Sequence, residues 1–322
     1  DAAPTGARIR RAFDRFADVS AESAEATARR IRGDRIAILI DLNGYTTNSR
    51  EQLFALRPAP LQVNSIGFPG TLGADWYDYI LVDGFAAPEA TQPFYTERLW
   101  RMPHSFYPSD TGRAPQGPSA GRVECGLPAR GFVFCCFNKA FKILPEVFAV
   151  WMRLLHAVAG SVLWLLESDP APSVNLRREA AAAGVDPARL VFAPRIPPQQ
   201  HLARHAAADL FLDTFPYGAH TTTNDALLMG LPVLTCAGET LVSRIAGSQL
   251  HAIGLPELVT ADFAGYEALA LALARDPARL AALRARLAAN RDTHPLFDMA
   301  GYTRDFESLM LQTWDEHHRR ER

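Results

Sequence analysis

Residues 209–243, DLFLDTFPYGAHTTTNDALLMGLPVLTCAGETLVS, determine the fold class of this chain. The stretch begins with an apolar run at 210–212, which is typical of a buried parallel strand, and breaks at the Pro-Tyr-Gly turn 216–218. A helical pattern then covers 226–229, and a second apolar run at 233–235 predicts the next strand. Strand, turn, helix and strand in this order predict a βα unit of a parallel sheet.

The start of the predicted helix carries the sequence AHTTTND at residues 219–225. A helix N-terminus offers unpaired backbone N–H groups and a partial positive charge, so it is a natural seat for phosphate. The alternative is that Thr221 to Asn224 simply cap the helix. The residues around this start decide between the two interpretations.

Length and composition limit the class of protein. A chain of 322 residues favours about two domains, and 48% hydrophobic with 21% charged residues is ordinary for a globular protein. The net charge of −2 predicts no nucleic-acid partner, and no apolar run approaches the ~20 residues needed to cross a bilayer, so no membrane partner is expected. The start DAAPTGAR lacks Met and a signal-type apolar core, so the chain reads as part of a longer one.

The cysteines and the standard motifs predict neither a metal nor a cofactor. Cys125, Cys135, Cys136 and Cys236 have no zinc spacing and no disulfide pattern, which favours reduced core residues and a cytoplasmic location. GxGxxG, Walker A and HExxH motifs do not occur.

Apolar runs at 35–40, 61–66 and 79–82 predict three strands in the first part of the chain, each followed by a loop that contains glycine. The stretch 107–126 is rich in Pro, Ser, Gly and Arg and predicts a linker. Ligands of open α/β sheets lie beyond the carboxyl ends of the strands, so the loops are the expected site.

The second part alternates strands and helices more regularly. The pattern predicts strands at 132–137, 162–166 and 190–192, and helices at 145–158, 174–183, 199–207, 241–253, 266–274, 277–288 and 299–319. We therefore predict an α/β protein with an N-terminal lobe (1–110), a linker (111–126), a C-terminal lobe (127–298) and a C-terminal helix (299–322). Two sheets joined by a linker imply a cleft, where small molecules preferentially bind.

Polar side chains follow the predicted strands of the second lobe. Lys142 offers a compact positive charge after the strand 132–137, and together with the helix start at 220–225 it predicts a diphosphate site. Asp225 lies about one turn inside that helix, where a carboxylate can hold ribose hydroxyls, although favourable charge near the helix N-terminus is an almost equal alternative. His201 could stack on a base or simply be exposed.

Several of these stretches resemble a known family. DLNGYTTNSREQLFALRPAPLQVNSIGFPGTLGADWYDYILVD (41–83), CCFNKAFKILPEVFAVWMRLL (135–155), SVLWLLES (161–168) and the opening stretch resemble the O-linked N-acetylglucosamine transferases, a family that includes SPINDLY-type O-fucosyltransferases. The resemblance implies a GT-B fold, two Rossmann-like lobes with the nucleotide sugar in the cleft. It also implies inverting transfer of N-acetylglucosamine from UDP-GlcNAc to Ser or Thr hydroxyls of protein acceptors, with no metal or other cofactor.

The resemblance assigns roles to individual positions. Lys142 and His220 are the implied catalytic residues, and both bind the donor diphosphate together with Thr221 and Thr222. Further implied contacts are Asp225 to the ribose, His201 and Arg204 to the base, Gly67 and Pro69 to the sugar, and Arg50, Asn138 and Lys139 in loops of the active site.

Two departures leave the donor open. Lys139 stands where relatives carry Gln or Asn, and Pro198 where the animal enzyme has a lysine that contacts ribose. GDP-fucose and UDP-glucose are therefore alternative donors. The resemblance also implies a preceding segment with active-site histidines and upstream TPR repeats that select the acceptor. A nucleotide-sugar-binding module without turnover, and an epimerase of the same architecture, are the alternatives in other classes.

Overall fold

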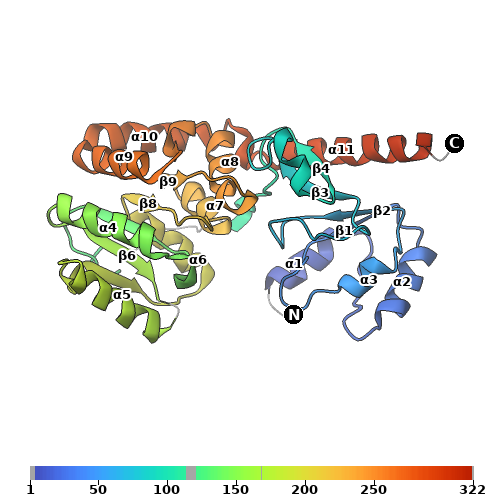
Figure 1. Cartoon of the computed structure of the whole chain (residues 1–322), viewed down its shortest axis with the longest axis horizontal. Coiled ribbons are helices and arrows are strands. Elements are labelled where there is room, and N and C mark those ends of the chain that lie inside the picture. The colour runs from blue at the N-terminus through green and yellow to red at the C-terminus, as the bar shows by residue number, and fades with distance from the viewer. Residues whose placement is uncertain (1–3, 114–120, 168, 321–322) are drawn as a thin grey trace.

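The computed structural model describes residues 4–113, 121–167 and 169–320, and forms two lobes that each contain one parallel sheet (Figure 1). Residues 114–120 of the predicted linker lie outside the described residues. The smaller sheet belongs to the first third of the chain, and the larger one to the part after residue 132. The alternation of strands and helices predicted from the sequence is confirmed in both.

The N-terminal lobe contains a four-stranded sheet in the order β1-β2-β3-β4. Its strands are β1 (Ile38–Asp41), β2 (Leu61–Asn64), β3 (Tyr79–Asp83) and β4 (Arg98–Met102), and its helices are α1 (Pro4–Ala12), α2 (Ala24–Gly33) and α3 (Glu51–Ala55). The expectation of three strands was wrong by one. β4 pairs with β3 along its whole length, but arginines at its first and fourth positions interrupt the apolar pattern that marks a strand.

The first strand also begins later than its apolar run suggested. Arg35 has φ of 54°, a left-handed conformation that ends the turn after α2 and cannot continue an extended strand. The ladder of β1 with β2 therefore starts at Ile38, opposite Leu61.

The C-terminal lobe contains a six-stranded parallel sheet in the order β10-β9-β8-β5-β6-β7. Its strands are β5 (Val133–Cys136), β6 (Val162–Leu166), β7 (Leu190–Ala193), β8 (Leu210–Leu212), β9 (Val233–Cys236) and β10 (Val259–Thr260). Its helices are α4 (Pro145–Ala157), α5 (Pro170–Ala182), α6 (Pro198–Ala203), α7 (Thr221–Leu228), α8 (Ile245–Ala252), α9 (Phe263–Arg275) and α10 (Pro277–Asn290).

The core of the C-terminal lobe explains the apolar runs. Trp151 of α4, Trp164 of β6, Phe211 of β8 and Tyr266 of α9 are buried in one continuous cluster. Cys135 and Cys136 of β5 lie in the same cluster and are free thiols, as the sequence predicted. Strands covered on both faces read as continuous apolar segments rather than alternating ones.

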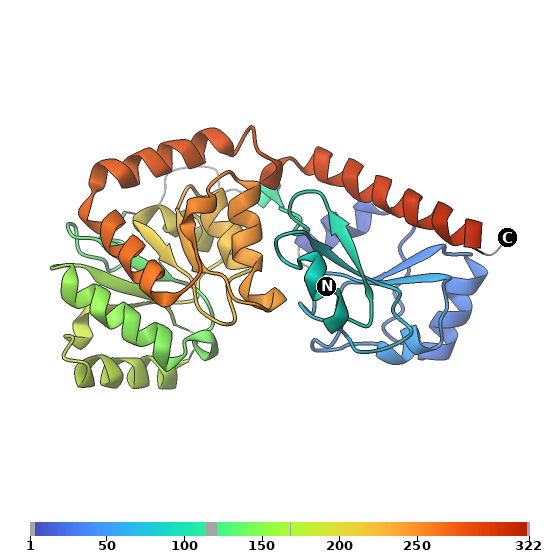
Figure 2. The same ribbon diagram turned by 45° about the horizontal axis from the view of Figure 1, so that its top comes forward.

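The last helix, α11 (Met299–Arg320), leaves the C-terminal lobe and packs along the N-terminal lobe (Figure 2). The indole N–H of Trp100 in β4 donates to Thr313 Oγ1 at 2.7 Å, and the Tyr302 hydroxyl donates to the Phe106 carbonyl at 3.0 Å. Within the described residues, no helix has both the length and the hydropathy needed to cross a membrane.

Candidate functional site

The first turn of α7 lacks a side-chain cap. His220 occupies the N-cap position, and no side chain among the described residues accepts a hydrogen bond from the N–H groups of residues 221–223. The hydroxyls are used elsewhere: Thr222 Oγ1 donates to Asn138 Oδ1 at 2.5 Å, and Thr221 Oγ1 shares a hydrogen bond of 2.6 Å with the Tyr107 hydroxyl. The capping interpretation of Thr221 to Asn224 is therefore wrong, and the first-turn N–H groups remain available to an anion.

Lys142 lies in a 3₁₀ turn (Ala140–Lys142) directly after β5, and its ammonium is half-buried beside the segment that leads into α7. Nζ donates to the Gly218 carbonyl at 2.8 Å and sits 3.8 Å from the centre of the Tyr217 ring. Burial lowers the pKa of Lys142, and the carboxylate of Asp213 opposes this shift. The structure thus brings the predicted phosphate-binding lysine to the loop at residues 213–220, which precedes α7.

Asp213 organises this 213–220 loop, although it was not a candidate from the sequence. Its Oδ1 accepts from the N–H groups of Thr214 and Ala219, both at 2.7 Å, and from Asn138 Nδ2 at 3.0 Å. Oδ2 accepts from the Thr235 hydroxyl at 2.8 Å. Burial raises the pKa of Asp213 to about 6, against the effect of these hydrogen bonds. The signal was an Asp directly after the apolar run 210–212, where a parallel strand delivers its loop.

His220 is held between the loop and α8. Its carbonyl accepts from Gln249 Nε2 at 3.0 Å, and its ring lies 5.5 Å from the ring of Tyr217. Burial, with a smaller contribution from the charge of Lys142, lowers the pKa of His220 to about 3, so the imidazole is neutral at pH 7. Its Nε2 is buried and has no hydrogen-bond partner among the described residues. The ring donates its one N–H toward the Val242 carbonyl, so Nε2 is the acceptor nitrogen and is suited to a ligand hydroxyl.

Asp225 lies on the second turn of α7 and is paired with a residue from the segment between the lobes. Arg113 donates from an Nη atom to Asp225 Oδ1 at 2.7 Å. Burial raises the pKa of Asp225, and the guanidinium of Arg113 opposes that rise. Neither Arg113 nor Tyr107 was a candidate from the sequence, because the stretch that contains them reads as a linker.

His201 and Arg204 form a pair that packs against Phe137, the residue directly after β5. Arg204 donates to His201 Nδ1 and, at 2.7 Å, to the Pro194 carbonyl, and its guanidinium lies 5.0 Å from the centre of the Phe137 ring. Burial, followed by the neighbouring His205 and Arg204, lowers the pKa of His201 to about 3. Arg204 is itself 2% exposed, so in this structure it supports the His201 ring rather than presenting its own charge to a ligand.

Gly67 and Pro69 belong to the loop after β2. A side chain at Gly67 would place its Cβ 2.3 Å from the Leu42 carbonyl oxygen, so this close approach of two loops requires glycine. Pro69 lines a cavity of about 360 Å³ between the lobes. Its other lining residues come from both lobes: Gly70, Thr71, Thr91, Phe94 and Tyr95 on one side, and Glu239, Thr240, Leu241 and Val242 on the other.

This cavity adjoins the 213–220 loop. The carbonyl of Val242, which lines the cavity, accepts a hydrogen bond from the Gly218 N–H at 3.1 Å. Gly218 is also the acceptor of the Lys142 ammonium. The cavity that Pro69 lines is therefore bordered by the loop that Lys142 contacts.

Two further predicted residues take no part in these contacts. Arg50 directs its guanidinium to the carbonyls of Val19 and Glu22, at 3.0 and 2.9 Å, and so ties the segment before α2 to the start of α3. Lys139 is exposed at the start of the 3₁₀ turn that contains Lys142. Within the described chain, no group of three or more His, Cys, Asp or Glu side chains is placed to hold a metal ion.

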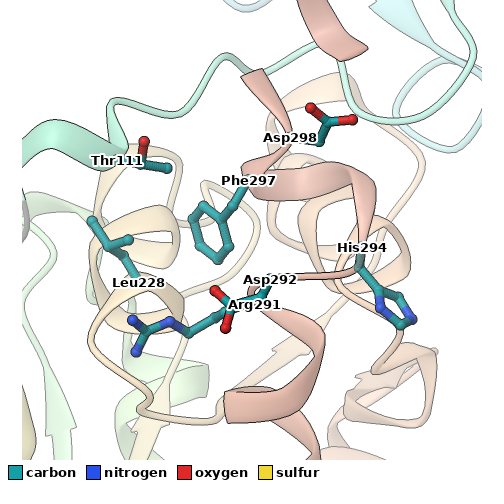
Figure 3. Close-up of a pocket in the computed structure, with 7 residues that line it drawn as sticks. All are labelled: Thr111, Leu228, Arg291, Asp292, His294, Phe297 and Asp298. Atoms are coloured by element: carbon teal, nitrogen blue, oxygen red, sulfur yellow. The ribbon is translucent and has the colours of Figure 1, made fainter. Parts of the chain in front are cut away.

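A cavity of about 430 Å³ lies near the opposite, C-terminal end of α7 (Figure 3). It is lined by Thr111, Leu228, Arg291, Asp292, His294, Phe297 and Asp298. None of these residues was a site candidate. The volume of a cavity alone does not identify the site, because the groups suited to bind phosphate converge at the other end of the helix.

Comparison with known proteins places the chain among glycosyltransferases. The profile of glycosyl transferase family 41 matches residues 1–116 and 114–306. The probable UDP-N-acetylglucosamine--peptide N-acetylglucosaminyltransferase SEC of Arabidopsis thaliana is 38% identical over 316 residues, which cover 96% of this chain and 32% of that protein. The chain thus spans about a third of the length of this relative.

Solved structures agree with this assignment. A mutant of the Thermobaculum terrenum O-GlcNAc transferase superposes with a TM-score of 0.92 at 31% identity, over 100% of this chain and 61% of that one. Sucrose-phosphate synthase from Thermosynechococcus elongatus superposes with a TM-score of 0.62 at 15% identity, over 91% of this chain and 77% of that one, which supports the fold alone. The GT-B fold expected from the sequence is confirmed, and the chain belongs to glycosyl transferase family 41.

Proposed function

We propose that this chain is the catalytic region of an enzyme that transfers N-acetylglucosamine from UDP-GlcNAc to Ser or Thr hydroxyls of proteins, with inversion and without a metal. The activity for which the Arabidopsis relative is named supports the donor and the peptide acceptor. The observation that carries the proposal is the convergence of Lys142 and the uncapped N-terminus of α7 beside the cavity between the lobes.

In this proposal the site stabilises the leaving group. Breaking the bond between sugar and phosphate builds negative charge on the departing UDP, and fixed positive groups around the diphosphate lower the energy of that state. Lys142 supplies one charge, and the N–H groups of residues 221–223 supply the positive end of the helix dipole. Asp213 and Asn138 hold these groups in place, so little reorganisation is needed during the reaction.

His220 acts as a neutral hydrogen-bonding group. With a pKa of about 3, its imidazole is a weak base at pH 7, and its unpaired Nε2 is suited to accept a hydrogen bond from a hydroxyl of the sugar or of the acceptor. Asp225 binds the ribose hydroxyls, and the ring of His201, fixed by Arg204, packs against the base. Pro69 and the cavity between the lobes receive the sugar and the acceptor hydroxyl.

Two measurements test this proposal. The first is incubation of the chain with radiolabelled UDP-GlcNAc and protein acceptors, with and without EDTA. We expect label on Ser and Thr side chains at equal rates in both. Tight binding of UDP with no label on protein would identify a binding module instead, and label lost with EDTA would exclude the metal-independent mechanism.

The second measurement is calorimetric titration with UDP and GDP. We expect UDP to bind more tightly. A preference for GDP would replace the proposed donor by a GDP-sugar such as GDP-fucose, while the assignment of the phosphate site to Lys142 and α7 would stand.

A further inference from the structure

The segment at residues 107–113, which leaves the N-terminal lobe and is here called the inter-lobe segment, contacts α7 at three positions. The Tyr107 hydroxyl meets Thr221 Oγ1 at 2.6 Å, Ser109 Oγ accepts from Asn224 Nδ2 at 2.6 Å, and Arg113 donates to Asp225 Oδ1 at 2.7 Å. These three α7 residues span the first two turns of the helix that carries the proposed phosphate site. The segment therefore lies against the nucleotide site and is more than a tether.

The contact between Arg113 and Asp225 uses one oxygen of a buried carboxylate. Asp225 is 8% exposed, and the guanidinium occupies its Oδ1. Among the described residues, no hydrogen bond reaches Oδ2. Oδ2 is not one of the buried side-chain oxygens that lack a partner, so it is accessible, and an ionised carboxylate has capacity for several donors. Oδ2 is thus the free acceptor of the pair.

The surroundings of the pair are anchored from the N-terminal side. Asp110 Oδ2 lies 3.8 Å from Arg113 Nε and also pairs with Arg8 of α1. Within the part of the chain that the structure describes, Tyr107 is the other titratable group near Asp225, and burial raises the pKa of its hydroxyl, so it stays neutral at pH 7. Arg113 is therefore the cation that faces the Asp225 carboxylate, and Asp110 holds that cation from behind.

We propose that Arg113 is a positioning residue of the donor site: its guanidinium fixes the Asp225 carboxylate through Oδ1, so that Oδ2 is presented to the ribose hydroxyls of the nucleotide. This inference rests on the proposed function and extends it to a residue outside the C-terminal lobe. The inter-lobe segment then recognises the ribose indirectly, through the orientation and charge of Asp225. Loss of Arg113 weakens the ribose contact while the phosphate seat at Lys142 and the start of α7 is retained.

The test compares two probes that differ only in the ribose, UDP and 2′,3′-dideoxy-UDP, by calorimetric titration. The wild-type chain should prefer UDP on the order of tenfold, because hydrogen bonds from hydroxyls to a charged acceptor are among the stronger ones. Arg113→Gln should reduce this preference to about threefold or less, while Arg113→Lys, which keeps the charge, should recover part of it. Asp225→Asn provides the reference for complete loss.

A second readout uses pH. Because Arg113 opposes the rise that burial causes in the pKa of Asp225, its removal raises that pKa further. UDP affinity should therefore begin to fall at a higher pH in Arg113→Gln than in wild type as the solution is acidified. A role confined to packing would weaken both probes equally and leave the pH profile unchanged.

Arg153→Gln is the matched control. Arg153 and Glu267 form a comparable ion pair at 2.7 Å between α4 and α9, away from the residues of the proposed site. This variant should bind both probes as wild type does, and circular dichroism confirms the fold of every variant. A shift in its UDP preference would show that loss of any arginine pair has this effect and would overturn the inference.

The remaining outcomes separate the two proposals. Wild-type preference retained in Arg113→Gln, with unchanged pH dependence, overturns the role of Arg113 and leaves the proposed function standing. Equal binding of UDP and its dideoxy analogue by the wild-type chain also overturns the inference, because the ribose is then not recognised. Failure of the wild-type chain to bind any nucleoside diphosphate overturns the proposed function and this inference together.

Discussion

Both lobes bury an aspartate at the carboxyl end of a strand, yet the two residues hold different parts of the molecule. Asp213, after β8, accepts hydrogen bonds from Thr214, Ala219, Asn138 and Thr235, all within the C-terminal lobe. Asp83, at the end of β3, accepts from the N–H groups of residues 85, 86 and 106. Its Oδ2 also accepts from Ser248 of α8, in the other lobe.

Asp213 therefore holds the loop of the proposed site, whereas Asp83 joins the two lobes. The partners of Asp213 shape the loop that carries the acceptor of Lys142 and leads into α7. The partners of Asp83 connect the loop after β3 with α8, where Arg244 adds a hydrogen bond to the Phe85 carbonyl at 2.8 Å. The same residue type in the same topological place thus organises the loop of the proposed ligand site in one lobe and an interface in the other.

The two lobes also differ in whether their hydrophobic core is built from their own residues alone. The C-terminal lobe has one continuous core. The N-terminal lobe has two smaller clusters, and the one on β3 and β4 is completed by Leu241 and Ile245 of the C-terminal lobe and by residues of α11. A small sheet buries too little surface alone, so it depends on elements that arrive from elsewhere in the chain.

Removal of the Lys142 charge, in the C-terminal lobe, should have the largest effect, and that effect is on the rate of transfer. Lys142→Ala should raise the activation free energy of transfer by about 3 kcal/mol, which lowers the rate by two to three orders of magnitude. A charge at the leaving group acts mainly on the transition state. Single-turnover transfer from UDP-GlcNAc measures this. Lys139→Ala alters the only other lysine, which is exposed on the same turn, and should have a much smaller effect. Equal losses would contradict the assignment.

Replacement of the two aspartates tests the contrast directly. Asp213→Ala and Asp83→Ala each strip a buried acceptor from several donors, and each should cost about 3 kcal/mol or more of unfolding free energy. Only Asp213→Ala should also weaken UDP binding, by roughly tenfold or more, because it releases the loop of the phosphate site. Urea unfolding and calorimetric titration measure the two effects. Comparable loss of UDP affinity in Asp83→Ala would remove the distinction.

Acid should destabilise the C-terminal lobe through its histidines. Burial lowers the pKa of His205 to about 4 and that of His220 to about 3, from 6.5 in the unfolded chain. The contribution of these neutral histidines to the free energy of unfolding is complete above pH 6.5. It is lost as pH falls through the pKa values of the folded state, since unfolding takes up protons. Below pH 6.5 each histidine adds about 1.4 kcal/mol per pH unit to the slope of the unfolding free energy against pH. Urea unfolding between pH 7 and pH 4.5 should show a shallower slope in His205→Gln, and an unchanged slope would refute the assignment.

The smallest expected effect concerns the support of the N-terminal lobe by α11. Thr313→Val preserves shape but leaves the buried indole N–H of Trp100 without its acceptor, which should cost about 1–2 kcal/mol of unfolding free energy. UDP affinity should not change, because both residues lie outside the site. Thermal unfolding monitored by tryptophan fluorescence measures the loss. Thr303→Val, at an exposed position of the same helix, is the control.

The sequence by itself determined the alternation of strands and helices, the βα unit at 209–236 and the position of Lys142 after a strand. These features are local: an apolar run, a turn and a helix start within 20 residues specify their own geometry. The resemblance to glycosyltransferases rests on the same local stretches, and the matching family profile confirms it.

Only the tertiary structure decided which distant groups meet. Strand β4 exists because it pairs with β3, the charge of Arg113 reaches Asp225 across 112 positions of chain, and α11 covers a lobe that precedes it by some 200 residues. Arg50 and Arg204 turned toward neighbouring carbonyls and rings rather than toward the cleft. A sequence pattern reports the conformation of a segment, but a side chain takes its partners from the packing of the whole molecule, where burial makes each unpaired polar group costly.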